Sequence, residues 1–520
     1  MTTLLDPPPA AAGARRRPLV VRVEETPLPP HDPLTLYEAL RDRLGAEQVF
    51  LLESLEAPEQ EGGDSLVGHG RLAEIQVYAD RVAVDGIAPV VDAVHTAADA
   101  LDLARLPGGT RALARVGQVW ELLRAVQGAF AVETAVPEDS YAFGFLATVG
   151  YGAAWHMERL PRRTADAGPD LVLGLFREVV HYDGATGAVR LRTAHGEGFP
   201  PAGPGPVEEA VATAVAGTGS GPDSDSGAAT RPAAGAVPQA PVPRAVRDST
   251  DEETFLKQAE RCLRHIGVGD IYQIQIGHRI EVTTDLAPLD VYRRLRHRNP
   301  SPHMYLVPRG GTTLIGASPE VLFATRGDVI VMRPIAGTAP RSGDAAVDGA
   351  RIAALRASEK ERAEHVMLVD LCRNDIGRVC RPGTLAVERL MTVERYSHVF
   401  HLVSGVEGRL APGEDTWSAL CATFPAGTVT GAPKIRAMEI IEELESEPRG
   451  MYAGAVGLVD LRGWSRLALC IRTVSHDGTA YSTQACAGIV ADSDPGAEWR
   501  ETLHKMGAAY WALTGEELLP

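Results

Sequence analysis

A segment rich in Gly, Pro, Ala and Ser separates the sequence into two parts between residues 196 and 247. Its middle reads GTGSGPDSDSGAATRPAAGAVPQAPVP, which buries too little apolar surface to offset the entropy lost on ordering. We therefore expect a flexible linker over residues 196–247, with room for a short helix over residues 207–216. This linker predicts two folded regions, residues 18–195 and 248–520, after a disordered N-terminus of residues 1–17.

The composition limits the classes of partner. Hydrophobic residues make up 45% and charged residues 23% of the 520 residues, which is enough for a large core. The net charge of -17 argues against nucleic acids and anionic membranes, because these bind excess Lys and Arg. The six cysteines lack paired CxxC spacing, so we expect neither a zinc ribbon nor a disulfide framework, but a reducing cytoplasm. Neither an export signal nor a membrane-spanning run of about 18 apolar residues is recognisable.

The two regions differ in their hydrophobic patterns. Residues 18–195 alternate short apolar runs with turns, including a predicted hairpin around residues 183–187. At the start of the second region, Ser249 and Glu252 form a capping-box pattern that predicts the beginning of a helix. Residues 348–374 predict a further helix, and strand-like runs alternate with helices to the end. The mixture predicts an α+β layered fold.

Two pairs of glutamates are candidate metal ligands. Glu361 and Glu364, like Glu498 and Glu501, are three residues apart, which places each pair on one helix face. If the two faces meet across a cleft, their oxygens suit Mg²⁺, which takes one or two carboxylates together with water and substrate oxygens. Lys505 lies on the same stripe as the second pair and is placed to meet a substrate carboxylate. The alternative is that both pairs are solvated helix surface.

Three turns are built from small residues that let backbone N–H groups approach an anion. They are residues 334–338, residues 424–433, which contain Thr428, and residues 484–488. The alternative for each is an ordinary tight turn. The sequence contains neither a Walker loop nor a GxGxxG motif that opens a βαβ unit, so nucleotide binding is not predicted.

Three polar side chains occur in strand-like apolar contexts. His401 in VFHLVSGV is either a hydrogen-bonded core residue or a group for proton transfer. Arg472 in LCIRTV requires an anionic partner, which is either a substrate carboxylate or a structural Asp. Tyr452 in MYAGAVG lies in a similar context. Together with the glutamates and the turns, these residues predict a cleft for a small polyanion and a divalent metal ion.

Taken together, these segments resemble the chorismate-utilising enzymes, and most closely the large subunit of anthranilate synthase. The resemblance is carried, in order along the chain, by GDIYQIQIGHR, NPSPHMYL, GASPE, RPIAGTAPR, SEKERAEHVMLVDLCRNDIGRV, YSHVFHLVSGV, FPAGTVTGAPKIRAMEIIEELE, GMYAGAVG, CIRTV and QACAGIVADSDPGAEWRETLHK. These motifs cover nearly all of residues 248–520, whereas FLLES and DSLVG carry the resemblance before the linker. It implies two packed antiparallel sheets with outer helices, joined by an N-terminal companion domain with a regulatory role.

The resemblance also implies a role for each matching residue. Mg²⁺ would be held by Glu364 and Glu501, with Glu361 and Glu498 close by. The substrate-binding set comprises Cys486, Ala487, Gly488 and Lys505 for the ring carboxylate of chorismate, Tyr452 and Arg472 for its enolpyruvyl carboxylate, Gly337 and Thr338 for the ring, and Thr428. Glu320 corresponds to the acid that helps the C4 hydroxyl leave, and His401 to the residue associated with loss of pyruvate.

The residues at two positions distinguish among the reactions of this family. Gln273 stands where water-adding relatives carry a Lys base, so ammonia is the expected nucleophile. Ala336 stands where aminodeoxychorismate synthases commonly carry a Lys that attacks the ring. We therefore expect component I of an anthranilate synthase, which converts chorismate and ammonia to anthranilate and pyruvate. The alternatives are a 2-amino-2-deoxyisochorismate synthase, which aminates without eliminating pyruvate, an aminodeoxychorismate synthase of specialised metabolism, and a non-catalytic binder of chorismate or tryptophan.

A partner subunit and an inhibitor follow from the same resemblance. None of the six cysteines lies in a Gly-x-Cys-x-Gly elbow, so the glutamine amidotransferase that supplies ammonia is expected to be a separate subunit. Ser54, Pro302, His303 and Met304 match the family's site for tryptophan as feedback inhibitor, with His303 in place of the usual Tyr. Cys486 stands where the family has Gly, and Gln275 and Gly277 also depart from the commonest wording.

Overall fold

The structure is a computed structural model that describes residues 17–56, 63–161, 168–201, 206–217, 237–396 and 399–519. Residues 1–16 of the predicted disordered terminus, and residues 202–205 and 218–236 of the predicted linker, lie outside the described residues. In the described ranges, hydrogen-bonded strands run antiparallel, apart from the parallel pair of β1 with β6. None of the helices in these ranges is long and apolar enough to span a bilayer.

The strands form one branched hydrogen-bonded network that has two halves. The first half follows the order β10 (Ala245–Asp248), β11 (Gln273–Thr283), β23 (Tyr481–Ile489), β22 (Thr473–His476), β13 (Thr312–Ser318), β12 (His303–Arg309) and β2 (Val49–Glu53). The second half follows the order β3 (Ser65–Val77), β8 (Leu171–Tyr182), β7 (Gly144–Val149), β20 (Ala455–Asp460), β21 (Ser465–Leu469), β14 (Val321–Arg326), β15 (Val329–Met332) and β18 (Val399–Arg409). The pairing of β2 with β3 joins the halves.

Shorter branches extend both halves. They are β19 (Gly431–Ala432) on β11, β16 (Ile335–Pro340) and β17 (Ala386–Arg395) on β18, β4 (Arg81–Gly86) on β3 with β5 (Arg111–Ala112) beyond it, and β9 (Val189–Gly196) on β8 with β1 (Leu19–Leu28) and β6 (Phe130–Thr134) beyond it. The hairpin predicted around residues 183–187 is confirmed, because β8 and β9 pair on either side of that turn.

The two halves pack face to face over a shared apolar core. Phe50 of β2 and Tyr305 of β12 lie in the same buried cluster as Leu146 of β7, Phe176 of β8 and Leu458 of β20. Strands alternate their side chains between two faces, so each half can bury one face in this core and offer the other to helices. The expected α+β fold with packed antiparallel sheets is confirmed, with the sheets being halves of one network.

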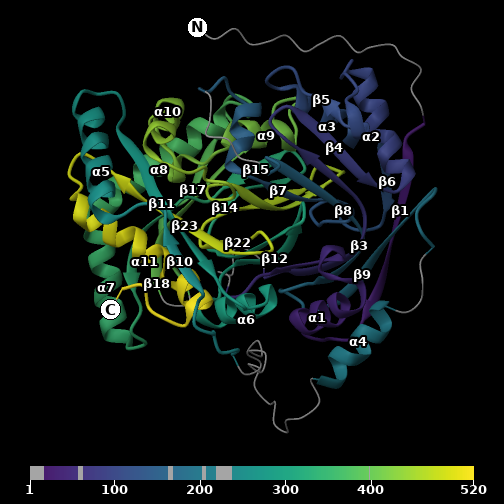
Figure 1. The fold of residues 1–520 in the computed structure, drawn as a ribbon, viewed down its shortest axis with the longest axis horizontal. Coiled ribbons are helices and arrows are strands. Elements are labelled where there is room, and N and C mark those ends of the chain that lie inside the picture. Colours follow the sequence, from purple (N-terminus) through teal and green to yellow (C-terminus); the bar gives the residue numbers. More distant parts are fainter. Residues whose placement is uncertain are drawn as a thin grey trace.

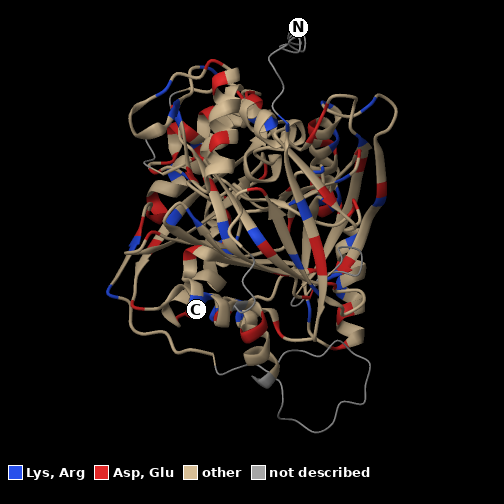
Figure 2. Cartoon of the chain, turned by 90° about the vertical axis from the view of Figure 1, so that its right-hand side faces the viewer, with Lys and Arg blue, Asp and Glu red and all other residues tan. Residues whose placement is uncertain are grey.

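Helices cover the outer faces of the strand network. Their bounds are α1 (Pro33–Leu44), α2 (Ala88–Ala100), α3 (Gln118–Gln127), α4 (Pro206–Gly217), α5 (Glu252–Gly267), α6 (Pro288–Arg298), α7 (Ala345–Ala357), α8 (Glu359–Gly377), α9 (Thr416–Thr423), α10 (Lys434–Leu444) and α11 (Pro495–Thr514), with 3₁₀ turns at η1 (Ala46–Gln48), η3 (Pro107–Gly109), η4 (Tyr151–His156) and η5 (Gly427–Val429). Figure 1 shows α2 and α3 at one end of the molecule and α5, α7 and α11 at the opposite end. Acidic and basic positions are interspersed over the elements in the side view (Figure 2).

Two helix starts differ from the expectation. The N-cap of α5 is Asp251, whose carboxylate accepts a hydrogen bond from the Thr254 N–H, whereas the Ser249 hydroxyl accepts from Arg279 N–H on β11. The single helix predicted over residues 348–374 is two helices, because Ser358 ends α7 and caps α8 through the Glu361 N–H. A Ser side chain satisfies free N–H groups at a helix start and so favours a new helix there.

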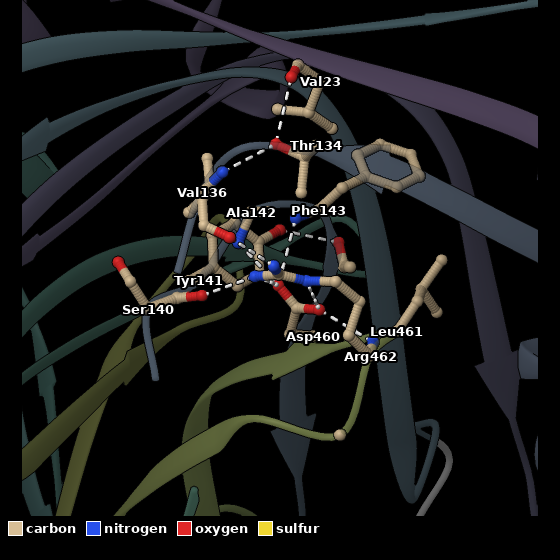
Figure 3. Close-up of polar contacts among 12 residues, drawn as sticks. Val23, Thr134, Val136, Ser140, Tyr141, Ala142, Phe143, Asp460, Leu461 and Arg462 are labelled. Atoms are coloured by element: carbon tan, nitrogen blue, oxygen red, sulfur yellow. Dashed lines mark hydrogen bonds and ion pairs between the residues drawn. The ribbon is translucent and has the colours of Figure 1, made fainter. Parts of the chain in front are cut away.

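The regions before and after the predicted linker share strands and core. The buried carboxylate of Asp460, at the end of β20, accepts hydrogen bonds from Ala142 and Phe143 N–H in the first region, and it also pairs with Arg462 (Figure 3). Arg462 in turn donates to the Val136 carbonyl. The described part of the predicted linker contains α4 and β10, and Val207, Ala210 and Val211 of α4 are buried in one apolar cluster with side chains of α1.

Candidate active site

Most of the predicted catalytic and substrate-binding residues line one cavity of about 200 Å³. From the predicted set, its wall includes Gln273, Glu320, Glu364, His401, Thr428, Tyr452, Arg472, Cys486 and Lys505. These residues come from β11, the turn after β13, α8, β18, η5, β23, α11 and the segments around β20 and β22. The fold thus collects side chains that are more than two hundred residues apart in the sequence.

The predicted glutamates converge at the edge of this cavity. Burial raises the pKa of Glu364, and the neighbouring Glu361 and Glu501 carboxylates raise it further. Burial likewise raises the pKa of Glu498, with Glu501 again contributing. Lys505 forms a salt bridge of 2.6 Å with Glu501. Glutamates of α8 and α11 therefore share one electrostatic environment and are not separate solvated surfaces.

The side chains of these glutamates are not close enough to one another to form a complete set of metal ligands. Throughout the part of the chain that the structure describes, no group of three or more His, Cys, Asp or Glu side chains is close enough to hold a metal ion. The ammonium group of Lys505 pairs with Glu501, whereas the charged groups with the largest effect on the pKa of Glu364 are the carboxylates of Glu361 and Glu501. The resulting excess of negative charge is the feature of the donor set that favours a divalent cation.

Glu320 is an acid held in its protonated form. The residue is half-buried in the cavity wall, and burial raises the pKa of its carboxyl group to about 8, against the opposing effects of the Thr428 hydroxyl and of Lys505. Its backbone is fixed by the Leu469 N–H, which donates to the Glu320 carbonyl at 2.9 Å. At neutral pH the carboxyl group carries a proton and can donate it to a leaving group in the cavity.

His401 is fixed in one tautomer by the turn opposite. Its Nδ1 lies 3.1 Å from the Gly337 carbonyl and 3.1 Å from the Thr338 hydroxyl. A carbonyl only accepts, so Nδ1 carries the hydrogen and Nε2 is left as the acceptor. Burial lowers the pKa of His401 to about 4, which keeps the ring neutral. Gly337 has a φ of +68°, and a Cβ there would lie 3.2 Å from Glu361, so this turn requires glycine.

The cavity wall also carries cationic and amide groups. Lys505 Nζ donates to the Cys486 carbonyl at 2.9 Å, and burial lowers the pKa of Arg472. A Cβ at Gly488 would lie 2.8 Å from Gln275 Nε2 and 3.2 Å from Gln273 Nε2, so both amide groups approach the Gly488 backbone. Such an array of donors suits a carboxylate ligand.

Several predicted residues border the cavity without lining it. They are Gly337, Thr338, Glu361, Ala487, Gly488, Glu498 and Glu501. Ala487 directs its side chain into the core beneath α5 and α10, so only its backbone is available to a ligand.

Other lining residues were missed from the sequence. Gln275 and Gln484 belong to the wall, and Gln275 lies two residues after Gln273 on the same face of β11. That period of two was the signal that could have identified Gln275. Gln484 lies on β23, two residues before Cys486, and the same period applies to it.

Three of the four residues predicted to bind tryptophan line a second cavity of about 90 Å³. Pro302, His303 and Met304 line it together with Glu53, which is buried and paired with Arg296 at 2.9 Å. Ser54 is not in the wall but adjoins Glu53, and its N–H donates to the Ser65 hydroxyl at 3.1 Å. This cavity is distinct from the one that holds Glu320.

Comparison with known proteins places this site in a family. The family model described as chorismate binding enzyme matches residues 74–510. The chain therefore belongs to the chorismate-utilising enzymes. It is 46% identical over 506 residues to the 2-amino-4-deoxychorismate synthase of Streptomyces globisporus, covering 96% of this chain and 98% of that protein. It is also 47% identical over 381 residues to anthranilate synthase component 1 of Streptomyces coelicolor, covering 72% of this chain and 73% of that protein.

Solved structures agree with the fold. Anthranilate synthase component I from Streptococcus pneumoniae is 28% identical with a TM-score of 0.65, covering 88% of this chain and 93% of that one. The menaquinone-specific isochorismate synthase of Escherichia coli is 18% identical with a TM-score of 0.64, covering 96% of each chain, and supports the fold alone.

Proposed function

We propose that this chain aminates chorismate at C2 with loss of the C4 hydroxyl group. The observation that carries the proposal is the Glu320 carboxyl, which lines the same cavity as Gln273, Arg472 and Lys505 and whose pKa, raised to about 8 by burial, keeps it protonated at neutral pH. A hydroxyl leaves poorly unless it is protonated, and Glu320 supplies that proton as the C4 oxygen departs as water.

Ammonia is the proposed nucleophile because the cavity offers Gln273 where a base for water would be needed. Among the described residues, Gln273 Oε1 is buried and has no hydrogen-bond partner. A carbonyl oxygen accepts the N–H of ammonia but cannot deprotonate water. The unpaired acceptor therefore supports a site for ammonia, which attacks C2 with its own lone pair.

The chain's cations and backbone hold the two carboxylates of the substrate in this proposal. Lys505 and the backbone of residues 486–488 bind the ring carboxylate, and Arg472 and Tyr452 bind the enolpyruvyl carboxylate. Burial raises the pKa of the Tyr452 hydroxyl, so it remains a donor at every working pH. Thr428 lies beside Glu320 at the ring. Charge-assisted hydrogen bonds at both ends fix the ring between Glu320 and Gln273.

Magnesium fits the carboxylates at the cavity edge. We infer that Glu364 and Glu501 would hold it, with Glu361 and Glu498 beside them, since burial and the neighbouring carboxylates both raise the pKa of Glu364 and Glu498. When bound, Mg²⁺ supplies positive charge that neutralises and orients the ring carboxylate.

The fate of the aminated ring leaves two candidate products. His401 favours anthranilate, because Nε2 is free to accept the C2 proton as pyruvate leaves. The similarity to the Streptomyces globisporus synthase over 96% of the chain favours release of the aminated compound itself. The name of that relative places the amino group at C2 and removes the oxygen from C4, which describes chorismate after amination and before pyruvate elimination. A covalent route to 4-amination lacks support, since Ala336 lines the cavity without a nucleophile.

A separate glutamine amidotransferase is the proposed source of ammonia. The name of the Streptomyces coelicolor relative, anthranilate synthase component 1, implies a second component for that enzyme. We also propose that tryptophan binds as an inhibitor in the cavity beside Glu53. Calorimetry of tryptophan binding to the wild-type protein and to the variant Met304→Ala tests this proposal.

A location in the cytoplasm stays a prediction.

One assay tests the function and separates the products. The purified chain is incubated with chorismate, MgCl₂ and an ammonium salt at alkaline pH, while anthranilate fluorescence and pyruvate are recorded. Anthranilate together with pyruvate supports the first product, and an aminated acid without pyruvate supports the second. Unconsumed chorismate in the presence of ammonia and Mg²⁺ contradicts the proposed amination.

A further inference from the structure

A second glutamine of β11 faces the chorismate cavity beside Gln273. Gln275 lines the same wall, and only 8% of its surface is exposed. The two residues are two positions apart on one strand, so their side chains lie on the same face of the sheet. In the part of the chain that the structure describes, the hydrogen bonds of Gln275 are made by its backbone, and none is made by its side-chain amide. Buried amides are normally hydrogen-bonded, so an unpaired one that faces a cavity indicates a ligand there.

The backbone of Gln275 is fixed on both sides. Its N–H donates to the Thr430 carbonyl at 2.8 Å, and its carbonyl accepts a hydrogen bond from Arg449 at 2.8 Å. Arg449 is itself buried and forms a salt bridge of 2.7 Å with Glu445. The side chain of Gln275 therefore extends into the cavity from a rigid base, so ordering it for a ligand costs only its own rotamer freedom.

The amide group of Gln275 lies over Gly488. The two residues are direct partners in the antiparallel register of β11 and β23. Directly opposed side chains share one face of a sheet, and Gly488 has no side chain, so Gln275 takes the space that a side chain at position 488 would occupy. A Cβ at Gly488 would lie 2.8 Å from Gln275 Nε2 and 3.2 Å from Gln273 Nε2. Two amide donors thus converge on one point above the backbone of Gly488.

The groups around this point suit an anion. Lys505 donates to the carbonyl of Cys486, two residues before Gly488 on β23. Amide N–H groups are donors that can bind a carboxylate without adding charge to the cavity. In the proposed function, Lys505 and the backbone of residues 486–488 bind the ring carboxylate of chorismate, which places that carboxylate within reach of both glutamines.

We propose that Gln275 is a further substrate-binding residue, whose side-chain amide donates a hydrogen bond to the ring carboxylate of chorismate. The inference rests on the binding mode in the proposed function and adds to it a group by which this chain recognises the ring carboxylate. Gln273 donates to the same carboxylate through Nε2 and keeps Oε1, which has no protein partner among the described residues, for ammonia at the adjacent C2.

The first test compares Leu and Glu at position 275. Gln275→Leu nearly keeps the size of the side chain but removes the donor, so the Kd and KM for chorismate should rise by at least about tenfold, with a smaller change in kcat. Gln275→Glu places a carboxylate opposite the ring carboxylate, and the Kd should rise by at least about 100-fold. If the side chain only filled space, Gln275→Leu would bind chorismate as tightly as wild type.

Two ligands identify the group that Gln275 contacts. The first, 3-(1-carboxyvinyloxy)benzoate, carries both carboxylates of chorismate on an aromatic ring, whereas the second, 2-phenoxyacrylate, lacks the ring carboxylate. Gln275→Leu should weaken binding of the first ligand by about tenfold and change the Kd of the second by less than about twofold. The second ligand thus reports that the variant is folded. Gln258→Leu makes the same exchange at an amide outside the cavity wall and should leave both Kd values unchanged.

Calorimetry without ammonia separates this inference from the proposed amination. Wild-type protein that binds chorismate but makes no aminated product when ammonia and Mg²⁺ are added contradicts the amination, and the two ligands still decide the role of Gln275. Binding of the first ligand by Gln275→Leu as tight as by wild type overturns the inference, and so does an equal loss of affinity for both ligands.

Discussion

Glu320 is the residue whose ionisation should dominate the pH dependence. Burial raises its pKa to about 8, so the carboxyl is protonated below that pH and loses its proton above it. At constant free ammonia, kcat/KM for chorismate should therefore fall as the pH rises through about 8. The measurement is a pH profile in which total ammonium is adjusted to hold free ammonia constant.

The variant Glu320→Gln is the control for the predicted fall of kcat/KM at alkaline pH. An amide cannot donate a proton to the C4 oxygen, so the rate of chorismate consumption should fall by at least about 100-fold. Chorismate binding should be retained, because glutamine preserves the shape of the side chain. If kcat/KM of Glu320→Gln still falls as the pH rises through about 8, the fall is caused by the ionisation of another group.

Replacing Glu364 should weaken the effect of Mg²⁺ on stability and on turnover. In wild-type protein, added Mg²⁺ should raise the melting temperature, since a ligand that binds the folded state stabilises it. Glu364→Gln should raise the half-saturating Mg²⁺ concentration by at least about tenfold in both the melting shift and turnover. Glu359→Gln removes the same charge from an exposed position on α8 and serves as the matched control. Equal Mg²⁺ responses in the two variants would remove Glu364 from the metal site.

The helix α11 is held against β11 by a group of side chains that adjoins its glutamates. His278 of β11 lies 2.7 Å from Asp248 and 2.8 Å from the Thr502 hydroxyl, and its ring stacks on Trp499 at 4.4 Å. Thr502 and Trp499 are the sequence neighbours of Glu501 and Glu498. The position of the carboxylates therefore depends on His278, which touches none of them.

Replacing His278 should weaken both stability and the metal response. His278→Ala removes one of the two hydrogen-bond partners of the Thr502 hydroxyl, which also donates to the Trp499 carbonyl, and it removes the stacked ring, so the free energy of unfolding should fall by about 2–4 kcal/mol. Urea unfolding measures this loss, and Mg²⁺ titration of turnover should show a higher half-saturation. His297→Ala, at an exposed position of α6, is the control. A stability loss without a change in the Mg²⁺ response would limit His278 to a structural role.

The starts of α5 and α8 mark the limit of what local patterns predict. The existence of both helices follows from their apolar spacing, but Ser249 and Asp251 are both good cap residues, and only β11 decides that Ser249 bonds Arg279 instead. The same limit holds in the cavity. Motif positions such as Glu320 and His401 could be predicted, whereas the pairing of Cys486 with Glu445 depends on strand register, which no local pattern contains.

At the scale of the whole molecule, the two regions form one hydrogen-bonded network. β2 pairs with β12 and β7 pairs with β20, so each region supplies strands to the other. Asp460 adds buried hydrogen bonds between them (Figure 3). The prediction of two regions with a linker describes the pattern of the sequence, but composition contains no information on which strands pair.

This shared network predicts how the two regions behave when they are produced as separate fragments. Residues 237–520 produced alone should aggregate, because β12 and β20 would expose unpaired edges and the core that covers Tyr305 and Leu458 would be open. Co-production with residues 1–217 restores both pairings, so the two fragments should co-purify as a complex that binds chorismate. Size-exclusion chromatography and calorimetry measure these outcomes. Asp460→Ala should weaken the two-fragment complex more than it weakens the intact chain, since only in the fragments does association depend on contacts alone. A monomeric, chorismate-binding fragment of residues 237–520 would show that the second region folds without the strands of the first.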